Sequence, residues 1–332
     1  MKAAIFHGLE DIRVEEKEIR PLKENELLIR VKACGICGTD IHIYHGEQGS
    51  APVTPPVVLG HEYAGEVVEI GPGVKDFSVG DYITVDPNMF CGTCEYCRSD
   101  KPYLCNHLTA LGVNLDGGFA EYSIVPTTQA YKFPKHVSFE EAALTEPLAC
   151  SLHGSDLAEI KPGDKVAIIG AGAIGLMMTQ LAKISGASYI LVSEFSKERR
   201  ELALELGADA AVHPVEEKID ENAFDVVIEC AGKIAAMESA IKIAKKGATI
   251  VLFSVPSPDA ELKVKPFEIF QKELTIKGSF INPFTQKRAL DLIASGKVQV
   301  KPLISHEFSV DDIHKGLEMQ RNPEAIKVVV KP

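Results

Sequence analysis

Lys165 to Met178 read KVAIIGAGAIGLMM, and this stretch decides how the chain around it is expected to fold. A short apolar run typical of a buried strand leads into a GxGxxG pattern, and an apolar segment typical of a helix follows. Glycines at such a junction permit a tight turn, the approach of a pyrophosphate and close packing of helix on strand. The pattern predicts a dinucleotide site on the helix N-terminus. The residues expected to hold it are Gly170, Gly172, Ala173, Ile174 and Gly175.

An acidic residue about 20 positions after the glycines normally binds the adenosine ribose. Glu194 ends the next apolar run, SYILVSE, nineteen positions after Gly175. A carboxylate there repels a 2′-phosphate, so the sequence favours NAD over NADP. Arg199 and Arg200 would weaken that preference if either reached the ribose, but on the following helix both are expected to be solvated.

The sequence on either side of this stretch changes character. Downstream, the apolar runs SYILVS, FDVVIEC and ATIVLFS alternate with helical segments, which is typical of a parallel sheet buried under helices. Upstream, to about residue 149, short strands are separated by glycine and proline, which indicates an all-β, barrel-like domain. The fold class is therefore α/β, with a doubly wound sheet beside a β-barrel.

Length and charge exclude several classes of protein. The 332 residues carry 45% hydrophobic side chains and a formal net charge of −12, from 35 basic and 47 acidic residues. Two globular domains fit that length. The negative charge disfavours nucleic acid and anionic lipid as partners. No run approaches the roughly 20 apolar residues of a membrane span, and the N-terminal stretch soon becomes charged. We therefore expect a soluble, cytoplasmic protein.

Four cysteines fall within fifteen positions. Cys91, Cys94, Cys97 and Cys105 have the spacing C-x2-C-x2-C-x7-C. Four thiolates in one loop are typical of a closed, structural Zn²⁺ site. An iron–sulfur cluster uses the same ligands, and spacing does not distinguish the metals; unliganded, reduced thiols are the remaining alternative. We favour zinc.

A second group of candidate ligands is scattered along the first half of the chain. GICGTDIHIYHG, LGHEYAG and TEPLAC supply one thiol, several imidazoles and several carboxylates. A catalytic zinc keeps three protein ligands and one open position, which a sulfur, an imidazole and a carboxylate can provide. The candidates are Cys37, Thr39, Asp40, His42, His45, His61, Glu62 and Glu146.

GICGTD, GHEYAGEV, the four-cysteine loop, GGFAEY, TEPLAC and GAGAIG follow one another in an order that covers essentially the whole chain. In this order the sequence resembles the zinc-containing medium-chain alcohol dehydrogenase family. The resemblance implies a GroES-like catalytic domain formed by residues 1–149 and 285–332, with a Rossmann NAD-binding domain at 150–284 between them. It also implies a homodimer or homotetramer, two Zn²⁺ ions per chain and an alcohol as substrate.

Residue by residue, the resemblance implies that Cys37 and His61 bind the catalytic zinc, with Glu62, Glu146 or both as the remaining ligands. Thr39 and His42 resemble the inner and outer members of a proton relay, and Asp40 resembles the acid that orients His61. In the implied reaction the zinc lowers the pKa of a substrate hydroxyl, and a hydride passes to the nicotinamide.

The substrate is less clearly implied. TEPLACSLHG and the carboxylate-rich site resemble polyol dehydrogenases that act on sorbitol, arabinitol or butanediol. IHIYHGE also resembles L-threonine 3-dehydrogenase, but those enzymes commonly carry a tryptophan after this segment and this chain has none. Threonine therefore ranks second, and a general alcohol third. A non-catalytic zinc-binding scaffold is the alternative from another class, and the combined catalytic set argues against it.

Overall fold

Two stretches far apart in sequence build the first of two units. In the computed structural model, which describes residues 1–47, 49 and 51–332, unit 1 consists of Met1–Ala149 and Asn282–Pro332, and unit 2 consists of Cys150–Ile281. The chain returns to unit 1 at Asn282 and not at the expected residue 285. The reason is that Asn282 is fully buried, and its Oδ1 accepts a hydrogen bond from Nδ2 of Asn88 at 2.9 Å.

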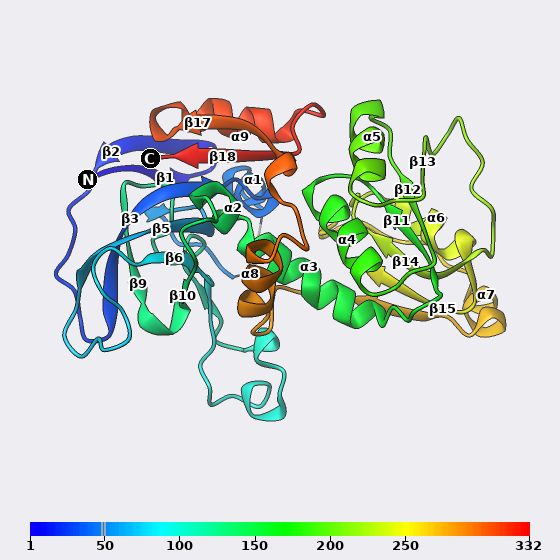
Figure 1. Ribbon diagram of the computed structural model, residues 1–332, viewed down its shortest axis with the longest axis horizontal. Coiled ribbons are helices and arrows are strands. Elements are labelled where there is room, and N and C mark those ends of the chain that lie inside the picture. The colour runs from blue at the N-terminus through cyan, green and yellow to red at the C-terminus, as the bar shows by residue number, and fades with distance from the viewer. Residues whose placement is uncertain (48, 50) are drawn as a thin grey trace. The chain divides into compact units, whose positions relative to one another are not determined.

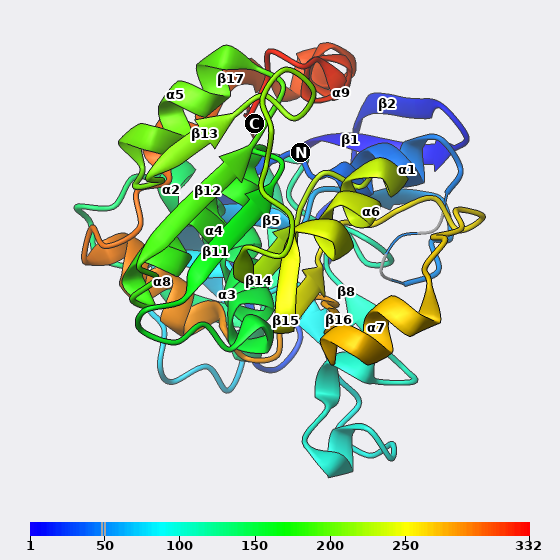
Figure 2. The same cartoon turned by 90° about the vertical axis from the view of Figure 1, so that its right-hand side faces the viewer.

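Unit 2 is built on a six-stranded sheet, which Figure 2 shows face on. The strand order is β13-β12-β11-β14-β15-β16 and every pairing is parallel. The apolar runs expected to be strands of a buried parallel sheet all lie in it. The strands are β11 (Lys165–Ile169), β12 (Tyr189–Ser193), β13 (Ala210–Val212), β14 (Phe224–Glu229), β15 (Ala244–Leu252) and β16 (Thr275–Gly278).

Helices cover both faces of this sheet. Figure 1 shows α4 (Ala173–Ile184) and α5 (Lys197–Glu205) on one side, and α6 (Ile234–Ile243) and α7 (Pro266–Lys272) on the other. The change of side follows from right-handed crossovers, because the chain builds outward from β11 in one direction and then from β14 in the other. The sheet therefore has a topological switch point between β11 and β14, where ligands of such folds bind.

Unit 1 is rich in antiparallel strands. Its largest sheet has the order β10-β6-β5-β3-β18-β17, with β9 also paired to β3; β2-β1-β4 and β7-β8 form smaller sheets. The strands are β1 (Lys2–Gly8), β2 (Asp11–Glu16), β3 (Glu26–Gly35), β4 (Val57–Val58), β5 (Glu62–Ile70), β6 (Tyr82–Val85), β7 (Asn88–Met89), β8 (Thr109–Ala110), β9 (Tyr122–Pro126), β10 (Ala130–Lys132), β17 (Ile304–Ser309) and β18 (Lys327–Lys331).

Few helices accompany these strands. They are α1 (Gly38–Tyr44), α2 (Phe139–Ala143), α8 (Gln286–Ala294) and α9 (Ile313–Arg321), and α3 (Thr145–Ala158) carries the chain from unit 1 into unit 2. Both chain ends lie in unit 1 (Figure 1). Among the described residues, no helix combines the length and apolar character needed to cross a membrane.

The last strand positions the candidate site of unit 1. β18 runs antiparallel to β3, with Val329 opposite Gly35, and on its other side β3 pairs with β5, where Gly35 lies opposite Glu62. The beginning of β5 and the beginning of β18 therefore lie on opposite sides of the end of β3. α1 starts three residues after β3, so its first turn is held at the same place.

Candidate active site

The four clustered cysteines come together in the loop between β7 and β8. Their sulfur atoms all lie within 4.8 Å of one another. The Sγ atoms of Cys91 and Cys97 are 3.9 Å apart, as are those of Cys94 and Cys105. Tetrahedral zinc with Zn–S bonds of about 2.3 Å separates its sulfur ligands by about 3.8 Å. The cluster therefore has the size of a zinc site with four thiolate ligands.

Hydrogen bonds reach two of the four sulfur atoms in this loop. The backbone N–H and the hydroxyl of Thr93, together with the N–H of Cys94, lower the pKa of Cys91 to about 5. Cys105 Sγ accepts hydrogen bonds from the N–H groups of Cys91 and His107, each at 3.3 Å. The thiolate is the form that binds a metal.

A second cluster of candidate ligands contains Cys37, His61 and Glu62, each of which offers one ligand atom within 4.8 Å of the others. Cys37 caps the N-terminus of α1, His61 precedes β5, and Glu62 opens that strand. One sulfur, one imidazole and one carboxylate are a donor set that zinc accepts.

Asp40 joins two members of this cluster. It is fully buried in the first turn of α1, where its Oδ2 accepts a hydrogen bond from the N–H of Cys37 at 2.8 Å. Its Oδ1 lies 3.4 Å from Nδ1 of His61. Burial lowers the pKa of His61, but the charges of Asp40 and Cys37 outweigh burial and raise it overall. The contact orients the imidazole, so that its other nitrogen is available to a metal.

Lys327, which the sequence reasoning did not single out, lies beside Glu62. Its Nζ is 2.8 Å from each carboxylate oxygen of Glu62 and donates to the carbonyl of Ile36 at 3.1 Å. Burial lowers the pKa of Lys327, but the charges of Glu62 and Cys37 raise it overall. The sequence shows Lys327 only as the first residue of a closing strand, and nothing local indicates its partner.

Glu146 is placed differently from Glu62. It lies in the first turn of α3 and is 6% exposed. Its carboxylate is not part of the three-residue cluster found among the described residues. Its charge is nevertheless one of those that raise the pKa of Lys327, which puts it in the same electrostatic environment.

Thr39 and His42 lie on α1, three residues apart and hence on one face of the helix. The Nδ1 of His42 is hydrogen-bonded to the carboxylate of Glu47, just beyond the helix. This carboxylate partner was not expected from the sequence. It holds one ring nitrogen of His42 in place.

In unit 2, the glycine turn follows β11 and opens α4. A Cβ on Gly175 would lie 1.8 Å from the carbonyl oxygen of Gly170, so only glycine allows the helix to pack this closely on the turn. Gly172 is the N-cap of α4, and Ala173 and Ile174 are its first residues. The predicted strand, turn and helix are thus in place, with the N–H groups of a helix N-terminus at the carboxyl edge of the sheet.

Glu194 follows β12 and contacts this turn. Its Oε2 accepts a hydrogen bond from the N–H of Ala171 at 2.7 Å, and its Oε1 accepts one from the N–H of Ser196 at 2.9 Å. Arg200, on the helix that follows, is half-buried and contacts the backbone next to Glu194. Its Nη1 donates to the carbonyls of Glu194 at 2.8 Å and Phe195 at 2.7 Å, because it reaches back over the first turn of α5.

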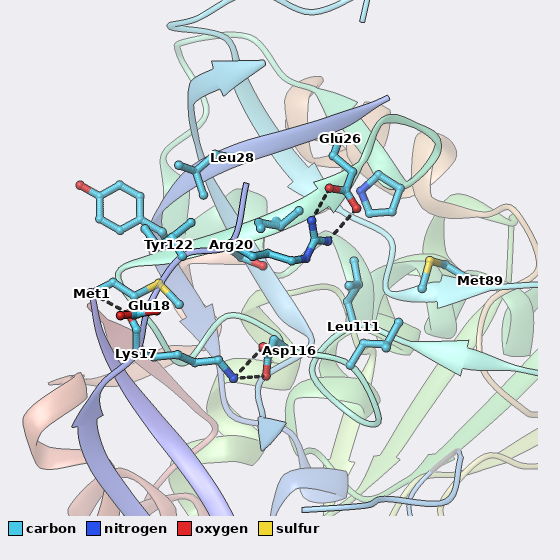
Figure 3. A pocket seen from close by; sticks show the side chains of 15 residues that line it. Met1, Lys17, Glu18, Arg20, Glu26, Leu28, Met89, Leu111, Asp116 and Tyr122 are labelled. Atoms are coloured by element: carbon cyan, nitrogen blue, oxygen red, sulfur yellow. Dashed lines mark hydrogen bonds and ion pairs between the residues drawn. The ribbon is translucent and has the colours of Figure 1, made fainter. Parts of the chain in front are cut away.

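Two cavities lie elsewhere in the units. One of about 370 Å³ in unit 1 has two ion pairs at its rim, Arg20 with Glu26 and Lys17 with Asp116 (Figure 3). No residue expected in the active site lines it. The other, of about 540 Å³, lies in unit 2 where β15 and β16 end, and includes Ser254 and Phe280.

Known proteins resemble both units. Residues 23–135 match the model of the alcohol dehydrogenase GroES-like domain, and residues 173–295 match that of zinc-binding dehydrogenases. The GroES-like and Rossmann-like expectations for the fold are thereby confirmed.

Relatives match over the full length of the chain. Sorbitol dehydrogenase of Bacillus subtilis (strain 168) is 33% identical, over 100% of this chain and 97% of its own. L-threonine 3-dehydrogenase of Vibrio atlanticus (strain LGP32) is 35% identical, over 97% and 96%. The structure of a zinc-binding dehydrogenase of Sinorhizobium meliloti 1021 bound to NADP is 41% identical, with a TM-score of 0.96 over 100% and 99%. The chain belongs to the zinc-containing medium-chain alcohol dehydrogenase family.

Proposed function

We propose that this dehydrogenase oxidises a secondary alcohol, and specifically a polyol or diol of the sorbitol, arabinitol or butanediol type, to the ketone with NAD. The observation that carries the proposal is the cluster of Cys37, His61 and Glu62, whose ligand atoms lie within 4.8 Å of one another. Its carboxylate, and the nearby carboxylate Glu146, suit a substrate with several hydroxyl groups. The likeness to sorbitol dehydrogenase over the full chain also supports it.

In this proposal, zinc when bound lowers the pKa of the substrate hydroxyl, and the nicotinamide accepts the hydride. Cys37 and His61 hold the metal, together with Glu62 or Glu146. The hydroxyl of Thr39 takes the proton, and His42, held by Glu47, passes it toward solvent. Gly170 to Gly175 hold the pyrophosphate.

Glu194 supports NAD as the cofactor. Its carboxylate lies beside Ala171 at the end of β12, where the adenosine ribose of a bound dinucleotide is expected. A 2′-phosphate would meet this negative charge. The likeness to an NADP-bound structure makes the test of both cofactors decisive.

L-threonine is the second candidate substrate, and a general alcohol the third. Threonine is supported by the likeness to L-threonine 3-dehydrogenase, whose sequence identity with this chain, 35%, is similar to the 33% of sorbitol dehydrogenase. One feature argues against threonine. L-threonine 3-dehydrogenases commonly carry a tryptophan just after the HIY segment, and this chain contains no tryptophan.

The test uses purified protein with its metal content measured. We expect two zinc ions per chain and oxidation of sorbitol, arabinitol or butanediol with NAD at higher kcat/KM than threonine or primary alcohols. Cys37→Ala should lose one zinc and the activity while still folding; Cys34→Ala, which removes a buried thiol outside both clusters, should keep both. Preference for threonine or NADP, or activity in Cys37→Ala, would contradict the proposal.

We also propose that two copies associate through the free edge of the unit 2 sheet, in a homodimer or in a homotetramer built from such dimers. β16 is the last strand of the sheet, and Ile276 on it and Phe267 and Phe270 on α7 are 37%, 68% and 80% exposed. Exposed edges invite strand pairing. A second copy would cover this surface, and light scattering should show no monomer.

The eight cysteines, none of which is in a disulfide, favour a cytoplasmic location.

A further inference from the structure

Glu229 is a buried carboxylate that the reaction above does not use. It is the last residue of β14, next to the switch point of the sheet, and is 0% exposed. Its Oε1 accepts hydrogen bonds from the N–H groups of Ala231 at 2.7 Å and Gly232 at 2.8 Å. Its Oε2 accepts a hydrogen bond from the hydroxyl of Ser254. Within the described residues, its donors are all neutral.

A buried carboxylate of this kind costs folding free energy, which indicates that it has a role that a smaller neutral side chain cannot fill. Burial disfavours a carboxylate, and here hydrogen bonds offset that cost, because none of the described side chains places a cation beside Glu229. A turn after a strand can be closed by a smaller neutral residue at no such expense. The carboxylate does what a smaller side chain cannot do, since its two oxygens reach two different loops at once.

The two loops follow β14 and β15. Ala231 and Gly232 form the turn after β14, while Ser254 lies two residues after the end of β15 and lines the 540 Å³ cavity of unit 2. The turn after β14 also supports the glycine turn. A Cβ built on Gly170 would lie 3.1 Å from the backbone N of Ala231, so the two turns are in close contact.

Glu194 plays the corresponding part on the other side of the glycine turn, since it binds the N–H of Ala171 from the end of β12. The carboxyl ends of β12, β11, β14 and β15 follow one another along the sheet. A dinucleotide with its adenosine ribose at Glu194 and its pyrophosphate at Gly172 therefore extends past β14 toward β15 with its nicotinamide half.

We propose that Glu229 is a positioning residue for the nicotinamide half of the cofactor. It ties the turn at Ala231 to the loop at Ser254, and so fixes the far half of the crevice relative to the glycine turn. The inference rests on the cofactor site proposed above, and it assigns Glu229 no contact with the reacting atoms.

The test compares the binding of NADH, followed by its fluorescence, with that of AMP, followed by competition. AMP fills only the adenosine half. Glu229→Ala should weaken NADH binding about tenfold, as expected for the loss of several hydrogen bonds, and leave AMP within about threefold. Glu229→Gln should restore NADH binding, because its amide oxygen accepts from both N–H groups and its amide nitrogen donates to Ser254 Oγ.

Ser254→Ala tests the same bridge without disturbing the core, and should weaken NADH about threefold with AMP unchanged. Ser188→Ala is the control: it also removes a hydroxyl that donates a hydrogen bond, to the carbonyl of Gly163 at 2.6 Å, but lies before β12, at the opposite edge of the sheet. It should change neither affinity.

Two results would overturn the inference: unchanged NADH binding in Glu229→Ala and Ser254→Ala, or equal weakening of NADH and AMP, which would show a structural role alone. If Glu229→Ala does not fold, the NADH and AMP affinities of Ser254→Ala and Glu229→Gln test the inference instead. Failure of the unaltered protein to bind either NADH or NADPH would instead count against the proposed cofactor site, so the two failures are distinguishable.

Discussion

Lys327 and Glu62 form a buried ion pair in which Nζ lies 2.8 Å from both carboxylate oxygens, with the two residues 5% and 1% exposed. They are 265 positions apart in sequence. The pair ties the last strand of the chain to a residue of the candidate zinc cluster. It also means that Glu62 has a cationic partner that competes with a metal for the same oxygens.

Removing the cation should destabilise the protein strongly. Lys327→Met leaves Glu62 buried without a partner, which typically costs about 3–5 kcal/mol of unfolding free energy. Urea unfolding measures it. Lys331→Met is the control on the same strand, because Lys331 pairs with Glu140 and Glu307 at a half-exposed position and should cost at most about 1 kcal/mol. Equal losses in the two variants would contradict the interpretation.

The same pair predicts which carboxylate binds zinc more tightly. Because Lys327 holds both carboxylate oxygens of Glu62, we expect Glu146 to be the carboxylate that binds zinc more tightly. Glu146→Gln should release the catalytic zinc to a chelator at a concentration at least about tenfold lower than the unaltered protein does. Glu62→Gln should keep zinc better but lower stability, since it leaves Lys327 unpaired. Competition with a chromogenic chelator gives both affinities, and the reverse order would show that Glu62 is the ligand.

The four-cysteine loop should depend on its metal for order. Cys94→Ser removes one of four sulfur ligands, so zinc should fall from two to one per chain, and the loop between β7 and β8 should become sensitive to protease. Metal analysis and limited proteolysis measure these effects. Cys230→Ser, a thiol outside both clusters, should retain two zinc ions. A Cys94→Ser protein with two zinc ions and a resistant loop would contradict the structural role.

Glu194 should control the choice of nicotinamide cofactor. Replacing it by Ala removes the charge that faces a 2′-phosphate, so the ratio of kcat/KM for NAD to that for NADP should fall by about tenfold or more, equivalent to about 1.4 kcal/mol. Glu198→Ala, an exposed acid on α5, is the control and should leave the ratio unchanged. Steady-state kinetics with both cofactors measure it. An unchanged ratio in Glu194→Ala would show that other residues select the cofactor.

Local patterns were enough to predict some features but not others. The sheet of unit 2 is predicted by the spacing of apolar residues, and its glycine turn by the backbone angles and close packing that only glycine allows. Both signals are contained within a few neighbouring residues. The four-cysteine cluster is equally local. Lys327 and Glu229 were missed because their roles depend on partners that only the folded chain supplies: a strand from the other end of the sequence, and the next strand of the sheet. The place of Asn282 in unit 1, three residues before the predicted boundary, likewise depends on Asn88, a partner that is remote in sequence.

Asp86 should make the stability of unit 1 depend on pH in a direction opposite to that of most carboxylates. Burial raises its pKa to about 6, although the N–H of Asn88 donates to it. In the unfolded chain the pKa returns to about 3.9, so between these values the folded protein binds more protons than the unfolded one. Stability from this group is therefore complete below about pH 4 and is lost as pH rises through 6, by about 3 kcal/mol for a shift of two units.

Asp86→Asn removes this titration. The difference in unfolding free energy between variant and unaltered protein therefore reports the titration of Asp86, because the contributions of all other groups are the same in both proteins. We expect the variant to gain relative stability between pH 4 and pH 7, measured by urea unfolding. Asp81→Asn should change in the opposite sense and mainly below about pH 4, because burial raises the pKa of Asp81 but Lys132 and the N–H of Ser78 lower it overall. A difference for Asp86→Asn that stays constant from pH 4 to pH 7 would show that this carboxyl group titrates normally in the folded chain.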